Sequence, residues 1–273
     1  MNVHGQQPKG RQPAALRRNA STGLNGPGVR TLLSESNLFK SAGLSAILTV
    51  MSVGRLVHAG KPLGMYVPMT FVAMMLVSGP VIAWGRYAGM PGVESDRLTL
   101  LRGAAIAAAL SLIALPVHLF WLDSLLQRAL LSAGRGALHE LSYPSTASAR
   151  ISLVLWSAGF QVMVLQAAPM SIFGRLSGRR SAAVGLCLAL RAYVASRQIA
   201  EAGITDCIPL FVVSALASTA AGCVVFARFG LAPTMLLAGG MDLHVFFTAP
   251  RSAGGPELSA GLGAAMARLG SLP

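Results

Sequence analysis

Long apolar stretches constrain this chain more than any other feature of its sequence. Five of them have almost no charged residues, and they occupy residues 63–84, 103–122, 151–173, 207–227 and 230–247. A helix of about 20 residues, rising about 1.5 Å per residue, crosses the roughly 30 Å of hydrocarbon in a bilayer. Hydrocarbon admits only helices and closed barrels, and continuous rather than alternating apolarity excludes the barrel. The sequence therefore predicts an all-α fold, a polytopic transmembrane helical bundle.

The amino-acid composition agrees with this prediction and indicates which kinds of partner the protein has. Hydrophobic residues make up 53% of the 273 residues and charged residues only 11%, against about 25% charge in soluble domains. This length accommodates about six to seven spans, so we expect the lipid bilayer as the main partner. The net charge of +13 does not indicate nucleic acid, because no basic helix with interleaved aromatic residues occurs.

Composition shifts divide the chain into three parts. Residues 1–37 are polar and basic and predict a disordered cytoplasmic tail. Residues 38–248 form the predicted transmembrane helical domain, and residues 249–273 a flexible tail rich in Gly and Ala. No organelle signal is evident, which favours a bacterial inner membrane. The sequence carries no signal for the oligomeric state.

Charge placement predicts the orientation in the membrane. The expected crossings are residues 41–58, 63–84, 103–122, 151–173, 181–197, 207–227 and 229–248. If residues 123–141 do not cross fully, the arginines between crossings fall mostly on the side of the N-terminal tail. Lys and Arg collect in cytoplasmic loops, so we expect a cytoplasmic N-terminus.

Ionisable residues at membrane depth are candidates for function, because burial in lipid is costly. They are His118, Asp123, Arg128, Arg191, Asp242 and His244. Arg55 is expected to extend to the interface, and Arg191 to face the bundle interior or interrupt its helix. Around a regular helix Asp242 and His244 differ by about 200°, and His118 and Asp123 by about 140°. Metal ligands on one helix must share a face, so the sequence predicts no metal site and no cofactor.

Three short segments resemble the motifs of a known family. Asp123-Ser124, with Arg128 four residues after Ser124, resembles a Glu-Glu-x-x-x-Arg motif, and Phe160 to Val164 resembles Phe-x-x-x-His. Residues 238–242 resemble His-x-x-x-Asn/Asp and follow a predicted tight corner at 228–231. In this order, over about residues 100–248, the chain resembles the CPBP (Abi, CAAX-protease-like) intramembrane proteases.

The resemblance implies the catalytic chemistry of the family, but several of the residues that perform it are different in this chain. In the family, a glutamate and histidines activate a water molecule that attacks a peptide bond inside the membrane. Here Asp123 and Ser124 replace the glutamates, while Val164 and Ala238 replace the histidines. Valine and alanine cannot act as general bases.

The family positions that remain are Asp123, Arg128 and Asp242, and they are the candidate catalytic residues. His118 and His244 are expected to point away from the two lost histidine positions. We therefore expect a protein that binds a membrane segment or peptide or assists its maturation, with Arg128 paired to Asp123 or Asp242. If it is an enzyme, the resemblance implies an intramembrane endopeptidase with Asp123 as base.

Two alternatives come from other classes of protein. A permease subunit of an ABC-2-type exporter also has about six spans, a basic cytoplasmic tail and few intramembrane charges. It requires an ATPase partner, which a helix near residues 34–41 or the loop at 86–102 would contact. A structural scaffold without a ligand is the third interpretation.

Overall fold

The fold is entirely helical in the part of the chain that the structure describes. The computed structural model describes residues 27–85, 89–93, 95–203 and 208–248, and its regular elements are all helices. The prediction of an all-α fold is confirmed. The C-terminal tail from residue 249 and residues 1–26 of the N-terminal tail lie outside the described residues. Within the remainder of that N-terminal tail, α1 (Pro27–Leu32) and the start of α2 are helical.

Five helices are long and apolar enough to cross a membrane. They are α2 (Glu35–His58), α3 (Leu63–Trp84), the continuous helices Arg97–Ser132 and Ala147–Ser177, and Phe211–Phe229 within α10. Each of them coincides with one of the predicted crossings, so the chain is a multi-pass membrane protein by the length and composition of its helices. Their large apolar side chains point outward in many places, as lipid contact requires: Val50, Leu76 and Leu112 are exposed.

The two longest helices contain π-helical turns. Arg97–Ser132 consists of α4 (Arg97–Val117), the π-helical η3 (His118–Leu122) and α5 (Asp123–Ser132). Ala147–Ser177 consists of α7 (Ala147–Trp156), the π-helical η4 (Ser157–Gln161) and η5 (Met163–Ala167), and α8 (Ala168–Ser177). π-Helical turns are uncommon and concentrate at functional sites.

The remaining helices are less apolar or shorter. They are α6 (Gly136–Ser142), α9 (Arg180–Ala202), α10 (Ile208–Phe229), α11 (Leu231–Met241) and the 3₁₀ turn η7 (Asp242–Phe246). The predicted crossings at 181–197 and 229–248 correspond to α9 and to α11 with η7. Both segments are helical, but α9 carries several charged residues and the apolar helix Leu231–Phe246 is short.

Local chemistry explains where several helices begin and end. Asp96 caps α4 by accepting a hydrogen bond from the Thr99 backbone N–H at 2.9 Å, and Thr146 caps α7 in the same way. The predicted corner between α10 and α11 is confirmed at Gly230, whose φ of 89° favours glycine. A Cβ at this residue would lie 2.6 Å from the carbonyl oxygen of Gly92.

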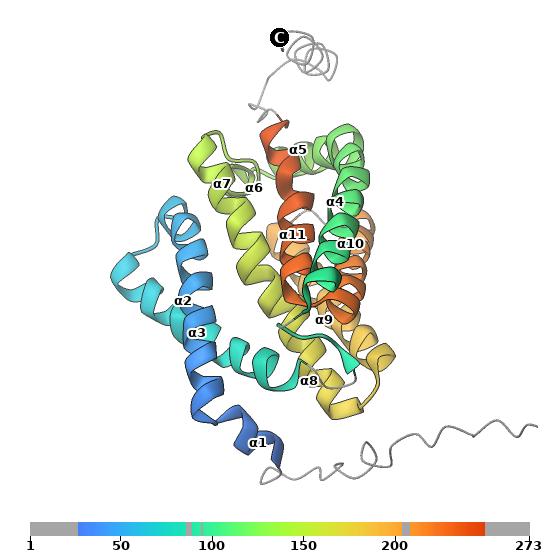
Figure 1. Cartoon of the computed structure of the whole chain (residues 1–273). Coiled ribbons are helices and arrows are strands. Elements are labelled where there is room, and N and C mark those ends of the chain that lie inside the picture. Colours follow the sequence, from blue (N-terminus) through green and yellow to red (C-terminus); the bar gives the residue numbers. More distant parts are fainter. Residues whose placement is uncertain (1–26, 86–88, 94, 204–207, 249–273) are drawn as a thin grey trace, which may run out of the picture.

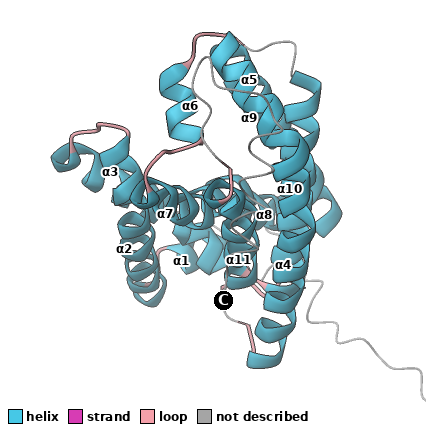
Figure 2. Cartoon of the chain, turned by 90° about the horizontal axis from the view of Figure 1, so that it is seen from above, coloured by secondary structure: helices cyan, strands magenta, loops and turns pink. Residues whose placement is uncertain are grey.

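The helices pack as a bundle with α11 and the α7–α8 helix near its centre. Figures 1 and 2 show α2 and α3 on one side of these central helices, and α4 and α10 on the other. The main core joins α2, α3, the α7–α8 helix, α9 and α10, and its fully buried side chains include Leu48, Met74, Met163, Met170 and Phe226.

Loops gather at two opposite ends of the bundle. At the end where α1 and α8 lie (Figure 1), the side chain of Arg180 donates to the Gly89 carbonyl and the Ser95 hydroxyl donates to the Phe229 carbonyl. At the other end, Arg55 donates to the Leu141 carbonyl and Arg150 to the Phe246 carbonyl. The helix that begins at Arg97 therefore runs from the first end to the second.

The segment 123–141 stays at this second end. It forms two helices, α5 and α6, because the chain turns at Gly134 with a φ of 67°. The following α7 starts at the same end and runs back through the bundle (Figure 1).

Candidate functional site

A polar cavity of about 330 Å³ lies inside the bundle, near the second end. It is bordered by all three π-helical turns, by α10 and by α11 with η7. Its charged and amide-bearing side chains are those of Arg55, His118, Asp123, Gln161, Gln166, Arg191, Asp242 and His244. Burying so many polar side chains among apolar helices costs free energy unless these side chains pair with one another or bind a ligand.

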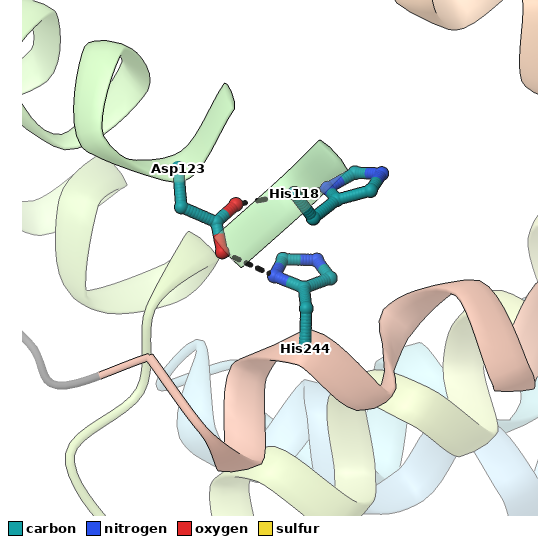
Figure 3. A group of neighbouring side chains, drawn as sticks. All are labelled: His118, Asp123 and His244. Atoms are coloured by element: carbon teal, nitrogen blue, oxygen red, sulfur yellow. Dashed lines mark hydrogen bonds and ion pairs between the residues drawn. The ribbon is translucent and has the colours of Figure 1, made fainter. Parts of the chain in front are cut away.

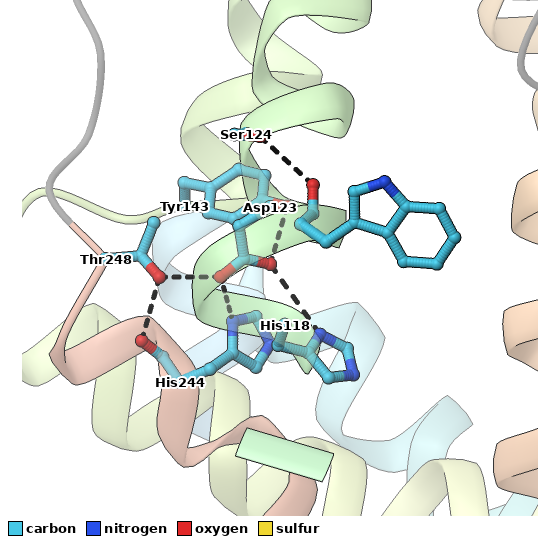
Figure 4. Close-up of polar contacts among 7 residues, drawn as sticks. His118, Asp123, Ser124, Tyr143, His244 and Thr248 are labelled. Carbon is cyan, nitrogen blue, oxygen red and sulfur yellow. Dashed lines mark hydrogen bonds and ion pairs between the residues drawn. The ribbon is translucent and has the colours of Figure 1, made fainter. Parts of the chain in front are cut away.

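The Asp123 carboxylate is the centre of the hydrogen-bond network at this cavity (Figure 4). Its Oδ2 atom accepts hydrogen bonds from His244 Nδ1 at 2.7 Å and from the Thr248 hydroxyl at 2.6 Å. Its Oδ1 atom accepts from the Tyr143 hydroxyl at 3.2 Å. The side chain is only 2% exposed, so these donors replace the water that a carboxylate needs.

His118 and His244 face the same carboxylate from two different helices (Figure 3). Their rings stack with centroids 4.3 Å apart and planes inclined by 23°. His118 Nδ1 lies 3.6 Å from Asp123 Oδ1. That distance is too long for a hydrogen bond, and this buried nitrogen makes none with the described residues. One of the two imidazoles is therefore hydrogen-bonded to Asp123, and the other only lies beside it.

The π-helical turn η3 explains how His118 comes to face Asp123. The backbone N–H of Asp123 bonds to the carbonyl of His118, five residues earlier, as in a π-helix. In a regular α-helix this spacing would place the two side chains about 140° apart. The wider turn brings them onto one face, and η7 at the end of α11 supplies His244 from across the cavity.

Tyr143 reaches Asp123 from the loop after α6. It is only 3% exposed, and burial, together with the nearby charge of Asp123, raises the pKa of its phenol above the usual range. The phenol therefore remains protonated and donates to the carboxylate. Tyr143 and Thr248 were not among the residues that the sequence singled out, because neither is ionised at neutral pH nor part of a motif.

A second group of charges lies in the same cavity. Asp242 interacts electrostatically with Arg55 and Arg191, and its carboxylate also lies close to the Ser157 side chain. The guanidinium of Arg55 reaches the second end of the bundle, where it lines the cavity, lies over Trp156 and donates to the Leu141 carbonyl at 2.5 Å. Its extension to the membrane interface stays a prediction. Of the two placements expected for Arg191, the structure has it facing the interior from an unbroken α9.

The three residues carried over from the motifs do not all meet. Asp123 and Asp242 line the same cavity, whereas Arg128 is exposed and its Nε donates to the Ser124 carbonyl of its own helix. Among the described residues, the ion-pair partners of Asp123 are His118 and His244. The expected pairing of Arg128 with Asp123 is therefore not formed.

A further expectation concerns the two histidines. His118 and His244 were expected to point away from their nearest altered motif positions and not to be simple substitutes for the family's histidines. The structure places both against Asp123, while Ala238 lines the same cavity and Val164 packs in the core. Arithmetic on a regular helix missed this because it ignored the π-helical turn and any ligand from another helix.

The same three side chains include the ligand types that a metal ion requires. One ligand atom from each of His118, Asp123 and His244 can be chosen so that all lie within 4.8 Å of one another. The expectation of no metal site considered only spacing along a single helix, and it did not consider this group.

Comparison with known proteins adds no identification. No model of a protein family, no curated protein and no solved structure matches this chain.

Proposed function

We propose that this multi-pass membrane protein receives a membrane-inserted peptide segment of another protein in the polar cavity and hydrolyses it. The observation that carries the proposal is the Asp123–His244 hydrogen bond of 2.7 Å at a cavity enclosed by apolar helices. A buried carboxylate paired with an imidazole is the usual way to position a general base. This pair supplies titratable groups that the valine and alanine at the altered motif positions cannot.

Hydrolysis requires one water molecule and a group that carries its proton. The water oxygen adds to the carbonyl carbon of the peptide bond as one proton passes to a side chain of the site. The carbon–nitrogen bond then breaks, and that proton moves to the departing nitrogen. Asp123, His118 and His244 lie close enough together to share these roles.

Gln166 supports the idea that the cavity receives a polar guest. Its Oε1 atom is buried and has no hydrogen-bond partner among the described residues, and the side chain lines the cavity. An unsatisfied buried acceptor costs about 1–3 kcal/mol. A backbone N–H of an entering peptide would remove this cost, which favours a peptide over a purely apolar guest.

The arrangement of the motif-like segments also supports the resemblance to CPBP proteases. Asp123 from the first segment and Ala238 and Asp242 from the last border one cavity, and Gln161 and Leu165 border it from the helix that contains the second. Segments that form one site in the proposed family thus surround one cavity here. The side chains that could carry out the hydrolysis are those of the Asp123 cluster, which consists of His118, Asp123 and His244.

The proposal is tested by photocrosslinking and cleavage in proteoliposomes. A photoreactive amino acid at Leu126, which lines the cavity, should capture added hydrophobic peptides, whereas the same probe at the exposed Leu112 of α4 should capture much less. Wild-type protein should cleave some members of a peptide library, and Asp123→Asn should abolish cleavage. Equal capture at both positions would refute binding in the cavity, and capture without cleavage would leave a binding protein.

A further inference from the structure

We propose that His118, Asp123 and His244 bind a divalent zinc ion at the edge of the cavity. This inference rests on the proposed function, because it names the ion that would activate water at the same site. Two imidazole nitrogens and one carboxylate form a three-residue ligand set of the kind found in catalytic zinc sites, which keep a fourth position for water. All three residues line the cavity.

The distances fit this ion with small movements. Ligands at about 2.1 Å from zinc in a tetrahedral site lie about 3.4 Å apart. His244 Nδ1 lies 2.7 Å from Asp123 Oδ2, and His118 Nδ1 lies 3.6 Å from Asp123 Oδ1. One ligand atom from each of the three side chains can be chosen so that all lie within 4.8 Å of one another. Side-chain rotations that draw the ligand atoms together by roughly 1–1.5 Å would therefore complete the site.

The stacking of the two imidazoles favours a metal over a purely protonic network. The two rings stack with centroids 4.3 Å apart beside the same carboxylate, and the buried Nδ1 atom of His118 has no hydrogen-bond partner among the described residues. A zinc ion bound by Asp123 and both imidazoles would accept the lone pair of this nitrogen and give it a partner.

Neighbouring hydroxyl groups already hold the carboxylate in position. Tyr143 donates to one oxygen of Asp123 and Thr248 to the other. Partners of this kind orient metal-binding carboxylates, and losing them typically lowers metal affinity by about 10–100-fold. Asp242 lies close enough to both histidines to interact electrostatically with them. Zinc would lower the pKa of a bound water molecule and so favour its attack on a peptide carbonyl.

The test measures metal content and ligand geometry in the full-length protein. Purified wild-type protein is dialysed against a chelator and reloaded with zinc chloride, and bound zinc is measured by mass spectrometry. We expect about one equivalent per chain. His118→Ala and His244→Ala should each lower bound zinc at least about tenfold. Loading with cobalt(II) should give the visible absorption of a tetrahedral complex in the wild type only.

Two controls separate the possible outcomes. His58→Ala removes an exposed histidine at the end of α2 and should leave zinc binding unchanged. His118 makes no hydrogen bond through Nδ1 with the described residues, so its replacement should preserve the folded state, which size-exclusion chromatography checks. Equal zinc content in wild type and His118→Ala would overturn the metal site. Cleavage by zinc-free protein would also overturn the metal site while supporting the proposed hydrolysis. Zinc binding without peptide cleavage would support the metal site and count against the proposed hydrolysis.

Discussion

At the scale of single residues, the arrangement depends most on the buried charge of Asp123. Three hydrogen bonds from different elements converge on this carboxylate: His244 follows α11, Tyr143 follows α6, and Thr248 lies beyond η7. Asp123→Asn replaces one acceptor oxygen with a donor amide that faces other donors. Breaking a buried charged network typically costs about 3–5 kcal/mol, so we expect a lower free energy of unfolding by about that amount.

Chemical denaturation in detergent measures this loss. Glu201→Gln is the matched control, because Glu201 forms an exposed ion pair with Arg197 at 3.3 Å and such pairs contribute at most about 1 kcal/mol. Equal effects of the two substitutions would mean that Asp123 is not the centre of a cooperative network.

At the same scale, Glu140 fixes the loop between α6 and α7. Its Oε1 accepts hydrogen bonds from the Ser145 backbone N–H at 3.0 Å and from the Ser145 hydroxyl at 2.7 Å. These bonds lower the pKa of the Glu140 carboxyl below its usual range. A lowered folded-state pKa stabilises the fold above the unfolded pKa of about 4.3, and this contribution disappears as the pH falls through the folded value.

Glu140→Gln should therefore be less stable than wild type at neutral pH, and this difference should shrink as the pH falls below the unfolded pKa of about 4.3. Glu140 is exposed, so the difference should stay below about 1 kcal/mol. Unfolding midpoints at neutral and acidic pH measure it. Ser145→Ala removes the hydroxyl donor but keeps the backbone N–H donor, so it should show part of the same pH dependence. A stability difference that persists in acid would show that Glu140 acts through something other than its charge.

At the scale of elements, α4 packs closely against α10 and α11 because small residues lie at the contact. A Cβ added to Gly103 would meet Phe229 Cβ at 2.6 Å and Pro233 Cγ at 2.7 Å. Neither atom is the end of a flexible side chain, so Gly103→Ala should cost about 1–3 kcal/mol through overpacking. Gly185→Ala in α9 is the matched control, because no atom lies within 4 Å of its Cβ, and it should stabilise the helix by about 0.5–1 kcal/mol. Unfolding free energies that change in the same direction for both variants would contradict this packing.

The helices were largely predictable from sequence because the apolar stretches are long and continuous. The predicted span 63–84 coincides with α3, and the corner at Gly230 follows from its Arg-x-Gly-Leu sequence. The site was less predictable. Asp123 and Asp242 were found because charge is rare in such helices, but the approach of His118 depends on a π-helical turn that no sequence pattern signalled. The approach of His244 depends on packing between helices far apart in the chain.

At the scale of the whole molecule, several arginines gather at the end of the bundle where α1 lies, while Arg55 and Arg150 lie at the opposite end. The turn that contains Arg175 and Arg179 lies at the same end as α1 in Figure 1, and Arg180 from this turn contacts Gly89. Arg150 contacts Phe246 at the opposite end. By the positive-inside rule we predict that the arginine-rich end faces the cytoplasm. The Asp123 cluster lies near the opposite end of the bundle, so this orientation would place it away from the cytoplasm.

Cysteine labelling in oriented membrane vesicles tests this orientation. In a background with Cys187, Cys207 and Cys223 replaced by alanine, we introduce Ser177→Cys at the arginine-rich end and Ala147→Cys at the other; both residues are exposed. An impermeant thiol reagent should label position 147 in intact right-side-out vesicles and position 177 only after permeabilisation. The reverse pattern would invert the protein and place the Asp123 cluster near the cytoplasmic face. Labelling of both positions in intact vesicles would mean that the two ends are not separated by a membrane.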